Sequence, residues 1–367
     1  MHADSPASTR PAFEPPAAGG ARPTLSVIVV TIDDFEAVRK TVRHLQTQTA
    51  RERLEIVLVC PDAARLALDP AEVAGVGGVR VVEVGSITSS AAARAAGIRA
   101  ASADVVALAE DHCFPAPDWA EALIAAHRGP WVAVGPVVGN ANPRSMLSWA
   151  NLIVEYGPWM APAVPREIDH LPGHNSSYKR APLLEYGDHL GEMMEAESVL
   201  QWDLVAKGHR LYHEPAARTF HLNYSRLSHS IALRFLGGRL FGGCRSRYWP
   251  AWRRLLYTLG APLIPAVRIT RLVRSMRRSP EQRALLPRIL PTFALALAFD
   301  GLGELVGYAL GAGSANAILT PLEFHRPRHL NARDRAAEEA SLGAPAPTRA
   351  VPSEARPAYP DGHAVVG

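Results

Sequence analysis

The sequence has very few cysteines. Its three, Cys60, Cys113 and Cys244, lie far apart in the chain. An odd number of widely spaced cysteines excludes the disulfide framework on which small secreted domains depend. No apolar run precedes Pro23, so the N-terminal sequence does not predict a secretory signal. We therefore expect a protein of a reducing compartment.

Charge is also modest. Charged residues make up 20% of the chain, and Lys and Arg exceed Asp and Glu by only four. Together with 48% hydrophobic residues, this composition excludes disorder in bulk and leaves room for a large domain with a smaller one. Both ends are rich in Pro, Ala and Gly, so we expect disordered tails over residues 1–22 and 326–367.

Short apolar runs alternate with helix-like segments over the first 125 residues or so. The runs predict strands over residues 25–31, 54–60, 79–84 and 104–109. After the first run, Val38, Val42 and Leu45 recur at helical spacing, and Asp33 or Asp34 is expected to cap that helix. Strand–helix alternation is typical of parallel strands joined by crossover helices, so we predict an α/β fold.

The strand over residues 104–109 ends abruptly in Glu110, Asp111 and His112, and a Pro-rich turn follows. Two acids and a histidine are costly to bury and are suited to binding cations. Ligands of open parallel sheets bind outside the carboxyl ends of the strands. The position of this motif therefore predicts a functional site.

Four segments follow one another along the chain: LSVIVVTIDDFEAVRKTVRHLQTQTARERLEIVLV, AAARAAGIRAASADVVALAEDHCFPAPDWAEAL, LPGHNSSYKR and EAESVLQWDLVAKGHRLYHEPAARTFH. They resemble segments of glycosyltransferase family 2, in the order that the family has them. The resemblance covers roughly residues 23–226 and implies a GT-A domain there, with a Rossmann-like, mostly parallel sheet and flanking helices. It also implies sugar transfer from a nucleotide-diphosphate donor, usually with inversion and with Mg²⁺ or Mn²⁺.

The resemblance suggests a metal site. Aligned on the Pro and Trp that follow, Glu110 and His112 take the two acidic positions of the family's DxD motif, with Asp111 between them. A divalent ion there can neutralise the departing diphosphate. His112 could instead cap the turn while an acid holds the metal. His221, which follows the late strand, could be a third metal ligand, a diphosphate contact or a structural histidine.

The resemblance also suggests catalytic and acceptor residues. Glu197 aligns with the acid that ends the family's ED motif and would act as general base, and Glu195 is its rival. Helical geometry puts the two carboxylates on different faces, and either could be an ordinary solvated carboxylate. Gly173, His174 and Asn175 match a GxN stretch that contacts the acceptor or the donor sugar.

The donor contacts are expected on the strand ends of the first half. Where the family commonly has an acid after the second strand, this chain has Cys60 and then Asp62. Asp62 could contact the nucleotide base from a shifted position, or Asp33 and Asp34 could carry more of that contact. The expected donor-binding set is Thr31, Asp33, Asp34, Asp62, Arg94 and Asp111, with Arg94 reaching the diphosphate or remaining a solvated helix arginine.

Beyond residue 226 the composition changes. Residues 234–288 hold thirteen arginines, no lysine and one acid, Glu281, interleaved with aromatic and aliphatic residues. An apolar segment over residues 285–313 follows, with a GxxxGxxxG series from Gly303 to Gly311 that suits close helix packing in lipid. It could span the membrane, insert partly or be a buried core helix. We expect a membrane-associated helical region over residues 227–325, with 234–313 contacting lipid and binding no nucleic acid.

The leading hypothesis is an inverting, metal-assisted hexosyltransferase of polysaccharide biosynthesis at the cytoplasmic face of the cell membrane. Its partners would be a nucleotide-diphosphate sugar and a glycan or lipid-linked acceptor. The alternative is a non-catalytic GT-A-like protein that binds nucleotide sugars, which the altered Glu-Asp-His motif keeps open. Nucleotidyl transfer is excluded because TIDDFEA contains no Gly-rich phosphate loop after the first strand.

Overall fold

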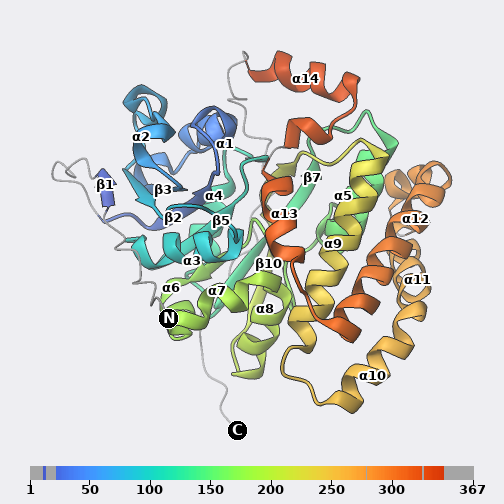
Figure 1. Cartoon of the computed structure of the whole chain (residues 1–367). Coiled ribbons are helices and arrows are strands. Elements are labelled where there is room, and N and C mark those ends of the chain that lie inside the picture. The colour runs from blue at the N-terminus through green and yellow to red at the C-terminus, as the bar shows by residue number, and fades with distance from the viewer. Residues whose placement is uncertain (1–10, 14–21, 278, 325, 343–367) are drawn as a thin grey trace, which may run out of the picture.

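The computed structural model describes residues 11–13, 22–277, 279–324 and 326–342 (Figure 1). Ten strands form one sheet in the order β1-β4-β3-β2-β5-β9-β7-β10-β6, with β8 paired to β10. The strands are β1 Pro11–Phe13, β2 Leu25–Val30, β3 Leu54–Cys60, β4 Gly78–Glu83, β5 Val105–Ala109, β6 Cys113–Pro115, β7 Ala133–Asn140, β8 Arg166–Ile168, β9 Ser177–Lys179 and β10 Leu211–His221.

The sheet is mostly parallel. β2 pairs in parallel with β3 and β5, β3 with β4, and β7 with β10, while the short β9 runs antiparallel between β5 and β7. Every residue of β2 and β3 is buried, as is usual for strands that are covered on both faces. The predicted α/β fold is confirmed, and the four strands predicted in the first half lie within a residue or so of their expected positions.

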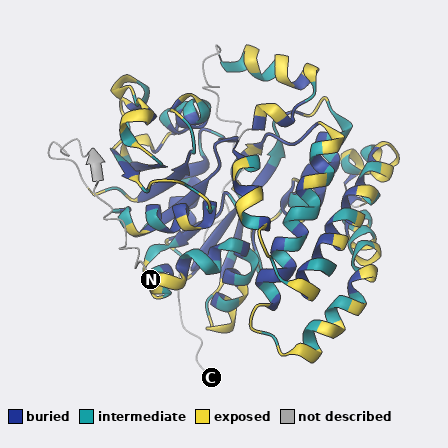
Figure 2. Cartoon of the chain, viewed as in Figure 1, coloured by how far each residue is buried: buried dark blue, intermediate teal, exposed yellow. Residues whose placement is uncertain are grey.

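Helices cover both faces of the sheet (Figures 1 and 2). Val27 and Val29 of β2 pack on one face, in the cluster that contains α1 and α4. Ile28 and Val30 pack on the other face, in the cluster that contains α3 and α8. The helices of this part are α1 Glu36–Gln46, α2 Ala63–Leu66, α3 Ser90–Ala100, α4 Trp119–Ala126, α5 Met146–Tyr156, α6 Arg180–Leu184, α7 Leu190–Met193 and α8 Glu197–Ala206.

The C-terminal region is a helical bundle packed beside the sheet domain (Figure 1). Its helices are α9 Leu227–Ser246, α10 Ala251–Gly260, α11 Ile264–Met276, α12 Pro280–Leu310, α13 Ala315–Glu323 and α14 Ala332–Leu342. α9 and α12 touch through backbone: a Cβ on Gly303 would lie 2.1 Å from the Phe235 carbonyl oxygen, and one on Gly307 2.4 Å from that of Arg239. The predicted glycine series therefore does pack against a neighbouring helix up to Gly307, whereas Gly311 ends α12 with φ +81°.

α12 is long and apolar enough to cross a membrane by length and composition, but 44% of its apolar window is buried inside the protein. The two acids inside its apolar part, Asp300 and Glu304, are paired within the bundle. Arg268 of α11 makes ion pairs with Asp300 and Glu304, and the Tyr308 hydroxyl donates to Glu304 Oε2 at 3.0 Å. These contacts explain how two acids are accommodated in the middle of an apolar helix.

Parts of the two segments that were expected to be disordered tails form regular secondary structure. β1 pairs with β4 inside the N-terminal stretch 1–22. At the other end, α14 continues the helical structure to Leu342, inside the stretch expected to be a tail from residue 326. Lys40 of α1 binds Glu338 at 2.6 Å, and buried Asp334 accepts a hydrogen bond from Asn142 Nδ2 at 3.0 Å. Polar tertiary contacts of this kind leave no local pattern. Residues 1–10, 14–21 and 343–367 lie outside the described residues.

Candidate active site

The sheet topology brings three distant segments to one edge. β5 ends at Ala109, so Glu110, Asp111 and His112 follow directly at its carboxyl end. β10 ends at His221, and β6, which begins at Cys113, pairs with it. The loop before β9 carries Asn175 to the same place. The predicted functional position of the Glu-Asp-His motif thus becomes a buried cluster.

Glu110 is the centre of this cluster and is 8% exposed. Its Oε2 accepts hydrogen bonds from Asn175 Nδ2 at 2.8 Å, Cys113 Sγ at 3.2 Å and the Tyr156 hydroxyl at 3.3 Å. Burial alone would raise the pKa of Glu110, but nearby His and Arg side chains, His174 foremost, hold it well below its usual range. Glu110 is therefore a carboxylate held in place by three donors.

Asn175 adopts a strained backbone to reach Glu110. Its φ is +67°, in the left-handed region that residues other than glycine rarely occupy. Such outliers persist where the surroundings fix them, and they cluster at functional sites. Asn175, the last residue of the expected GxN stretch, therefore orients the Glu110 carboxylate.

Two imidazole nitrogens face each other beside Glu110. Arg326 contacts His112 Nε2, and because arginine only donates, His112 must accept there and carry its proton on Nδ1, 2.5 Å from Asp111 Oδ1. His221 Nδ1 donates in the same way to Asn223 Oδ1 at 2.7 Å. The two Nε2 atoms are 3.2 Å apart.

Electron pairs therefore converge on one point, which is an arrangement that a cation stabilises. His112 Nε2 lies 3.5 Å from Glu110 Oε1, and His221 Nε2 lies 3.7 Å from Glu110 Oε2. Ligand atoms of Glu110, Cys113 and His221 all lie within 4.8 Å of one another. Of the expected ligands, Glu110 and His221 thus have electron pairs available for a metal ion, whereas the one lone pair of His112 Nε2 accepts from Arg326. With His112 added, which would require Arg326 to leave Nε2, one carboxylate and two imidazoles form a softer set than the all-oxygen shell that Mg²⁺ prefers.

A second charged group adjoins the first. Glu197 Oε1 is 2.9 Å from Arg94 Nη1 and 3.0 Å from His174 Nδ1, and His174 Nδ1 is 4.0 Å from Glu110 Oε1. Burial opposes ionisation of Glu197, yet the His174 imidazolium and the Arg94 guanidinium outweigh it and lower its pKa to about 2. For His174, burial is likewise outweighed by Glu197, and its pKa rises to about 9.

Gly173 makes room for this ion pair, because a Cβ there would lie 2.9 Å from Glu197 Oε2. Glu195 instead lies among residues of the C-terminal region, with Arg247 Nη2 at 2.6 Å and Asn316 Nδ2 at 3.1 Å from its carboxylate. Of the two expected catalytic acids, the structure therefore brings only Glu197 into contact with His174, which lies next to Glu110.

The expected donor-binding residues divide into two groups. Arg94 and Asp111 line the pocket beside Glu110. Thr31 is buried just after β2, where its Oγ1 accepts from the Asp33 amide at 3.2 Å, and the Asp34 carboxylate accepts from the Glu36 amide at the start of α1. Asp62 is exposed and caps α2 through the Ala64 and Arg65 amides, an ordinary structural role.

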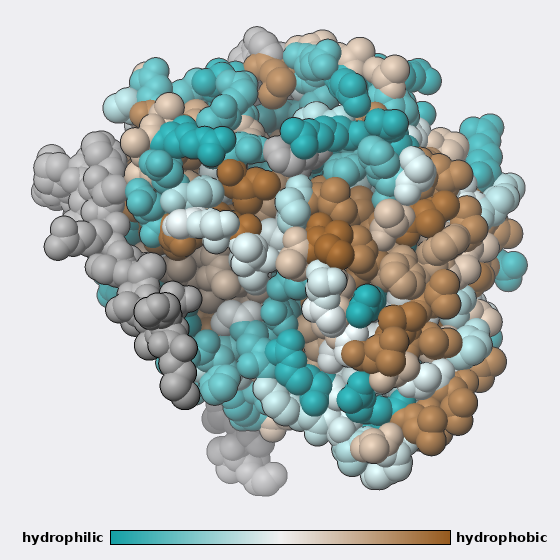
Figure 3. All heavy atoms as spheres, in the orientation of Figure 1, coloured by the Kyte–Doolittle hydropathy of each residue, from teal (hydrophilic) through white to brown (hydrophobic). Residues whose placement is uncertain are grey.

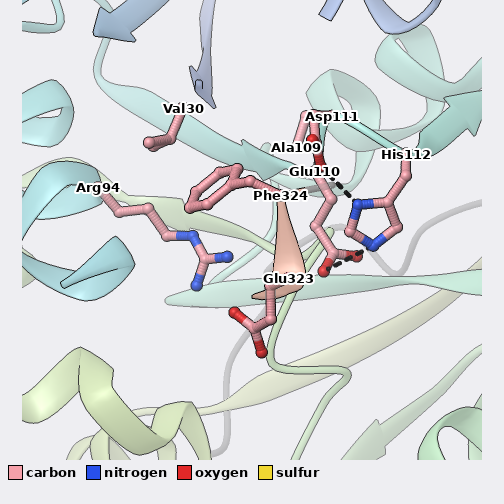
Figure 4. Close-up of a pocket in the computed structure, with 8 residues that line it drawn as sticks. All are labelled: Val30, Arg94, Ala109, Glu110, Asp111, His112, Glu323 and Phe324. Atoms are coloured by element: carbon pink, nitrogen blue, oxygen red, sulfur yellow. Dashed lines mark hydrogen bonds and ion pairs between the residues drawn. The ribbon is translucent and has the colours of Figure 1, made fainter. Parts of the chain in front are cut away.

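Figure 4 shows how the C-terminal region completes the pocket. Glu323, the last residue of α13, and Phe324 point in beside Arg94 and Glu110. The lining residues are Val30, Arg94, Ala109, Glu110, Asp111, His112, Glu323 and Phe324.

Several residues of the site were not predicted from the sequence. Two of them, Cys113 and Tyr156, donate hydrogen bonds to Glu110. Three others, Glu323, Phe324 and Arg326, come from a segment more than 200 positions further along the chain. Arg326 lies in the stretch that was expected to be a disordered tail. The only local signal was the run Glu-Phe-His-Arg-Pro after an apolar helix, which has no diagnostic spacing.

A mostly parallel sheet presents a buried carboxylate and two imidazoles at the carboxyl ends of its strands, where the ligands of open α/β sheets bind. Residues 26–187 match the family model described as Glycosyl transferase family 2, so this part of the chain is similar to that family. The match covers less than half of the chain. It ends before Glu197 and His221.

Among solved structures, the chain is similar to one titled "Crystal structure of S. aureus TarS 1-349". The identity is 15%, the alignment covers 78% of this chain and 91% of that one, and the TM-score is 0.41. A score this low supports no residue-level comparison. No curated protein matches the sequence at a significant level.

Proposed function

We propose that the protein transfers a hexose, with inversion, from a nucleotide-diphosphate sugar to a hydroxyl of a glycan or lipid-linked acceptor. One observation carries the proposal. A buried cluster of Glu110, His112 and His221 lies next to an ionised acid, Glu197, at the carboxyl ends of the strands, and His174 lies between Glu110 and Glu197.

In this proposal Glu197 is the general base. As the acceptor oxygen attacks the anomeric carbon, its proton passes to the Glu197 carboxylate. The bond from the anomeric carbon to the diphosphate breaks, and its electron pair leaves on the diphosphate oxygen. A pKa of about 2 makes Glu197 a weak base, because it is paired with both Arg94 and His174. An acceptor that displaces one of these partners would restore its basicity.

The metal is part of the proposal. Glu110 and His221 would hold a Mg²⁺ or Mn²⁺ ion, and His112 would join them once Arg326 has left its Nε2. The ion would supply positive charge at the leaving diphosphate. The two imidazoles favour Mn²⁺ over Mg²⁺. Arg94 and Asp111 line the same pocket and would contact the donor.

The test is donor turnover by the purified full-length chain. A panel of UDP-, GDP- and dTDP-sugars is incubated with an acceptor extract, with Mn²⁺, with Mg²⁺ or with EDTA. Release of nucleoside diphosphate and the anomeric configuration of the product are measured. Transfer with retention would contradict the inverting mechanism. Tight donor binding without turnover under any of these conditions would favour the non-catalytic alternative instead.

An exposed apolar surface supports the proposal of a lipid-linked acceptor. No residue of α10 is buried, and one face of it, continuing beyond its end, exposes Trp252, Leu255, Leu256, Leu259 and Leu263 by 59% to 71%. Hydrophobic side chains also gather over the C-terminal helices in Figure 3. Arg271 and Arg274 are exposed on the next helix, α11, and Arg277 is exposed just after its end. An apolar helix face beside exposed arginines is typical of a helix that lies in an anionic membrane surface.

Not all of the arginine-rich segment serves such a surface. Arg234 binds Glu155 at 3.1 Å, and Arg247 binds Glu192 and Glu195 at 2.6 Å. Arg254 donates to carbonyls at the end of α12. These arginines stabilise the bundle, so the proposed lipid contact is confined to α10 and α11, on the cytoplasmic face of the cell membrane.

Vesicle co-sedimentation tests this surface. The wild type should sediment with phosphatidylglycerol vesicles and less with neutral phosphatidylcholine vesicles. Leu255→Ser combined with Leu259→Ser should abolish the binding. The control, Val164→Ser, changes an apolar residue that is 66% exposed on the sheet domain. Equal sedimentation of all three proteins would contradict the proposed surface.

A further inference from the structure

Arg326 is a cation built into the site by the C-terminal region. It lies just beyond α13 and outside the part of the chain that matches the family model. The side chain is only 3% exposed, and it contacts His112 of the Glu-Asp-His motif. A charged side chain this deeply buried needs a physical reason, because removing it from water is costly.

Most of the hydrogen-bonding capacity of Arg326 is unused. A guanidinium has five N–H donors. The contact with His112 uses Nη2, and Cζ stacks 3.8 Å from the centre of the Tyr224 ring. Across the described part of the chain, neither Nε nor Nη1 of Arg326 has a hydrogen-bond partner. The other buried arginine of the site, Arg94, is by contrast paired with Glu197.

The neighbouring carboxylates attract Arg326 without hydrogen-bonding it. Glu110, Asp111 and Glu155 all favour its charged form, and its pKa is raised although burial opposes this. Each of them is engaged elsewhere: Glu110 with Asn175, Asp111 with His112, and Glu155 with Arg234. The negative potential of these carboxylates explains why Arg326 is charged. It does not provide hydrogen-bond acceptors for Nε and Nη1.

We propose that Arg326 binds the diphosphate of the nucleotide sugar through one of its unused donors, Nε or Nη1. The inference rests on the proposed function, because it takes that donor as the ligand. Nε–H and the N–H bonds of Nη1 point in different directions, so one of these nitrogens would donate to a phosphate oxygen, and a hydrogen bond between two charged groups is about twice as strong as a neutral one. The pocket lined by Glu110, Asp111 and His112 adjoins Arg326 through His112, and the proposal places the diphosphate there. Arg326 would stabilise the leaving group throughout the transfer.

Binding measured without turnover tests this role. Calorimetry with UDP, GDP, dTDP and inorganic pyrophosphate, in EDTA and again with Mn²⁺, gives dissociation constants for the full-length wild type. Arg326→Gln should weaken pyrophosphate and the best nucleoside diphosphate by about 10- to 100-fold, the equivalent of a lost hydrogen bond between charged groups. Arg326→Lys should lie between. The matched control is Arg328→Gln, which removes the same charge from an exposed residue two positions away and should change neither constant.

The outcomes separate the two proposals. If the wild type binds pyrophosphate in an Arg326-dependent manner but binds no nucleoside diphosphate, the donor proposal fails and the anion site stands. If Arg326→Gln binds both as tightly as the wild type, or if the wild type binds neither, the role of Arg326 is overturned. Thermal unfolding checks that each variant folds. If Arg326→Gln does not fold, Arg326→Lys is compared with Arg328→Lys instead. A several-fold loss of affinity only in Arg326→Lys supports the role of Arg326, and equal dissociation constants contradict it.

Discussion

At the scale of single residues, two opposing effects set the ionisation of the carboxylates in the site. Burial disfavours ionised Glu110 and Glu197, and positive side chains around them more than reverse this. His174 lowers the pKa of both carboxylates, because its imidazole lies between them. Changes at Glu197 or His174 should therefore be visible in both activity and stability.

Glu197→Gln should lower kcat by about 10²- to 10⁴-fold, the usual contribution of a general base, while donor binding changes little. Glu195→Gln should keep most of the activity, since Glu195 binds Arg247 and Asn316 away from the pocket. Steady-state turnover and calorimetric donor affinity of both variants make the comparison. If Glu195→Gln is the inactive one, the assignment of the base is wrong.

His174 should make stability depend on pH. Its pKa is about 9 in the folded protein, against 6.5 for a histidine side chain without partners. The stabilisation is fully present below pH 6.5 and is lost as the pH rises through 9. The free energy of unfolding should fall by on the order of 3 kcal/mol over that range, at about 1.36 kcal/mol per pKa unit. Urea unfolding at several pH values measures it, and His174→Gln should flatten that part of the profile. An unchanged slope in the variant would contradict the charged pair.

At the scale of elements, the contact between α9 and α12 depends on glycine on both sides. Gly238, Gly242 and Gly243 of α9 meet the backbone of α12 and of Ala312 just beyond it, and Gly303 and Gly307 of α12 meet the backbone of α9. No other residue permits so close an approach, because its Cβ would overlap a carbonyl or an amide. The sequence pattern on α12 predicted close packing, but it did not identify the partner.

Adjacent glycines of α9 provide a matched test. A Cβ on Gly238 would lie 2.1 Å from the Asp300 carbonyl oxygen, whereas one on Gly237 would meet no atom within 4 Å. Gly238→Ala should destabilise the protein by about 1–3 kcal/mol through overpacking. Gly237→Ala should stabilise it by about 0.5–1 kcal/mol, because alanine is the better helix former. Urea unfolding of the two variants measures both, and equal effects would mean that the helices are not in contact.

At the scale of the whole molecule, the C-terminal region returns to the sheet domain and completes its pocket. α13 brings Glu323 and Phe324 into the pocket, and α14 binds α1 through Lys40 and Glu338. α12 is packed against α5, α9, α10 and α11, and the two acids of its apolar part are paired with Arg268. If the proposed membrane contact is made, these contacts favour a bundle that rests on the membrane surface over one that spans it.

Carbonate extraction of membranes from cells that express the full chain should therefore release the protein into the soluble fraction. High salt alone should release part of it, because exposed arginines contribute about 1 kcal/mol each at an anionic surface. Immunoblots of pellet and supernatant give the distribution, with a known integral protein as the reference for retention. Retention in the pellet after carbonate would contradict the peripheral arrangement.

The sequence by itself determined the sheet domain, because buried β-branched runs and intervening helices have periods that can be read locally. It also indicated the Glu-Asp-His motif, since acids that end an apolar strand have no structural explanation. Tertiary structure alone decided which acid pairs with His174, how His112 and His221 meet, and that Arg326 reaches them. Such contacts join segments up to 214 positions apart, so they depend on chain packing and leave no periodic trace in the sequence.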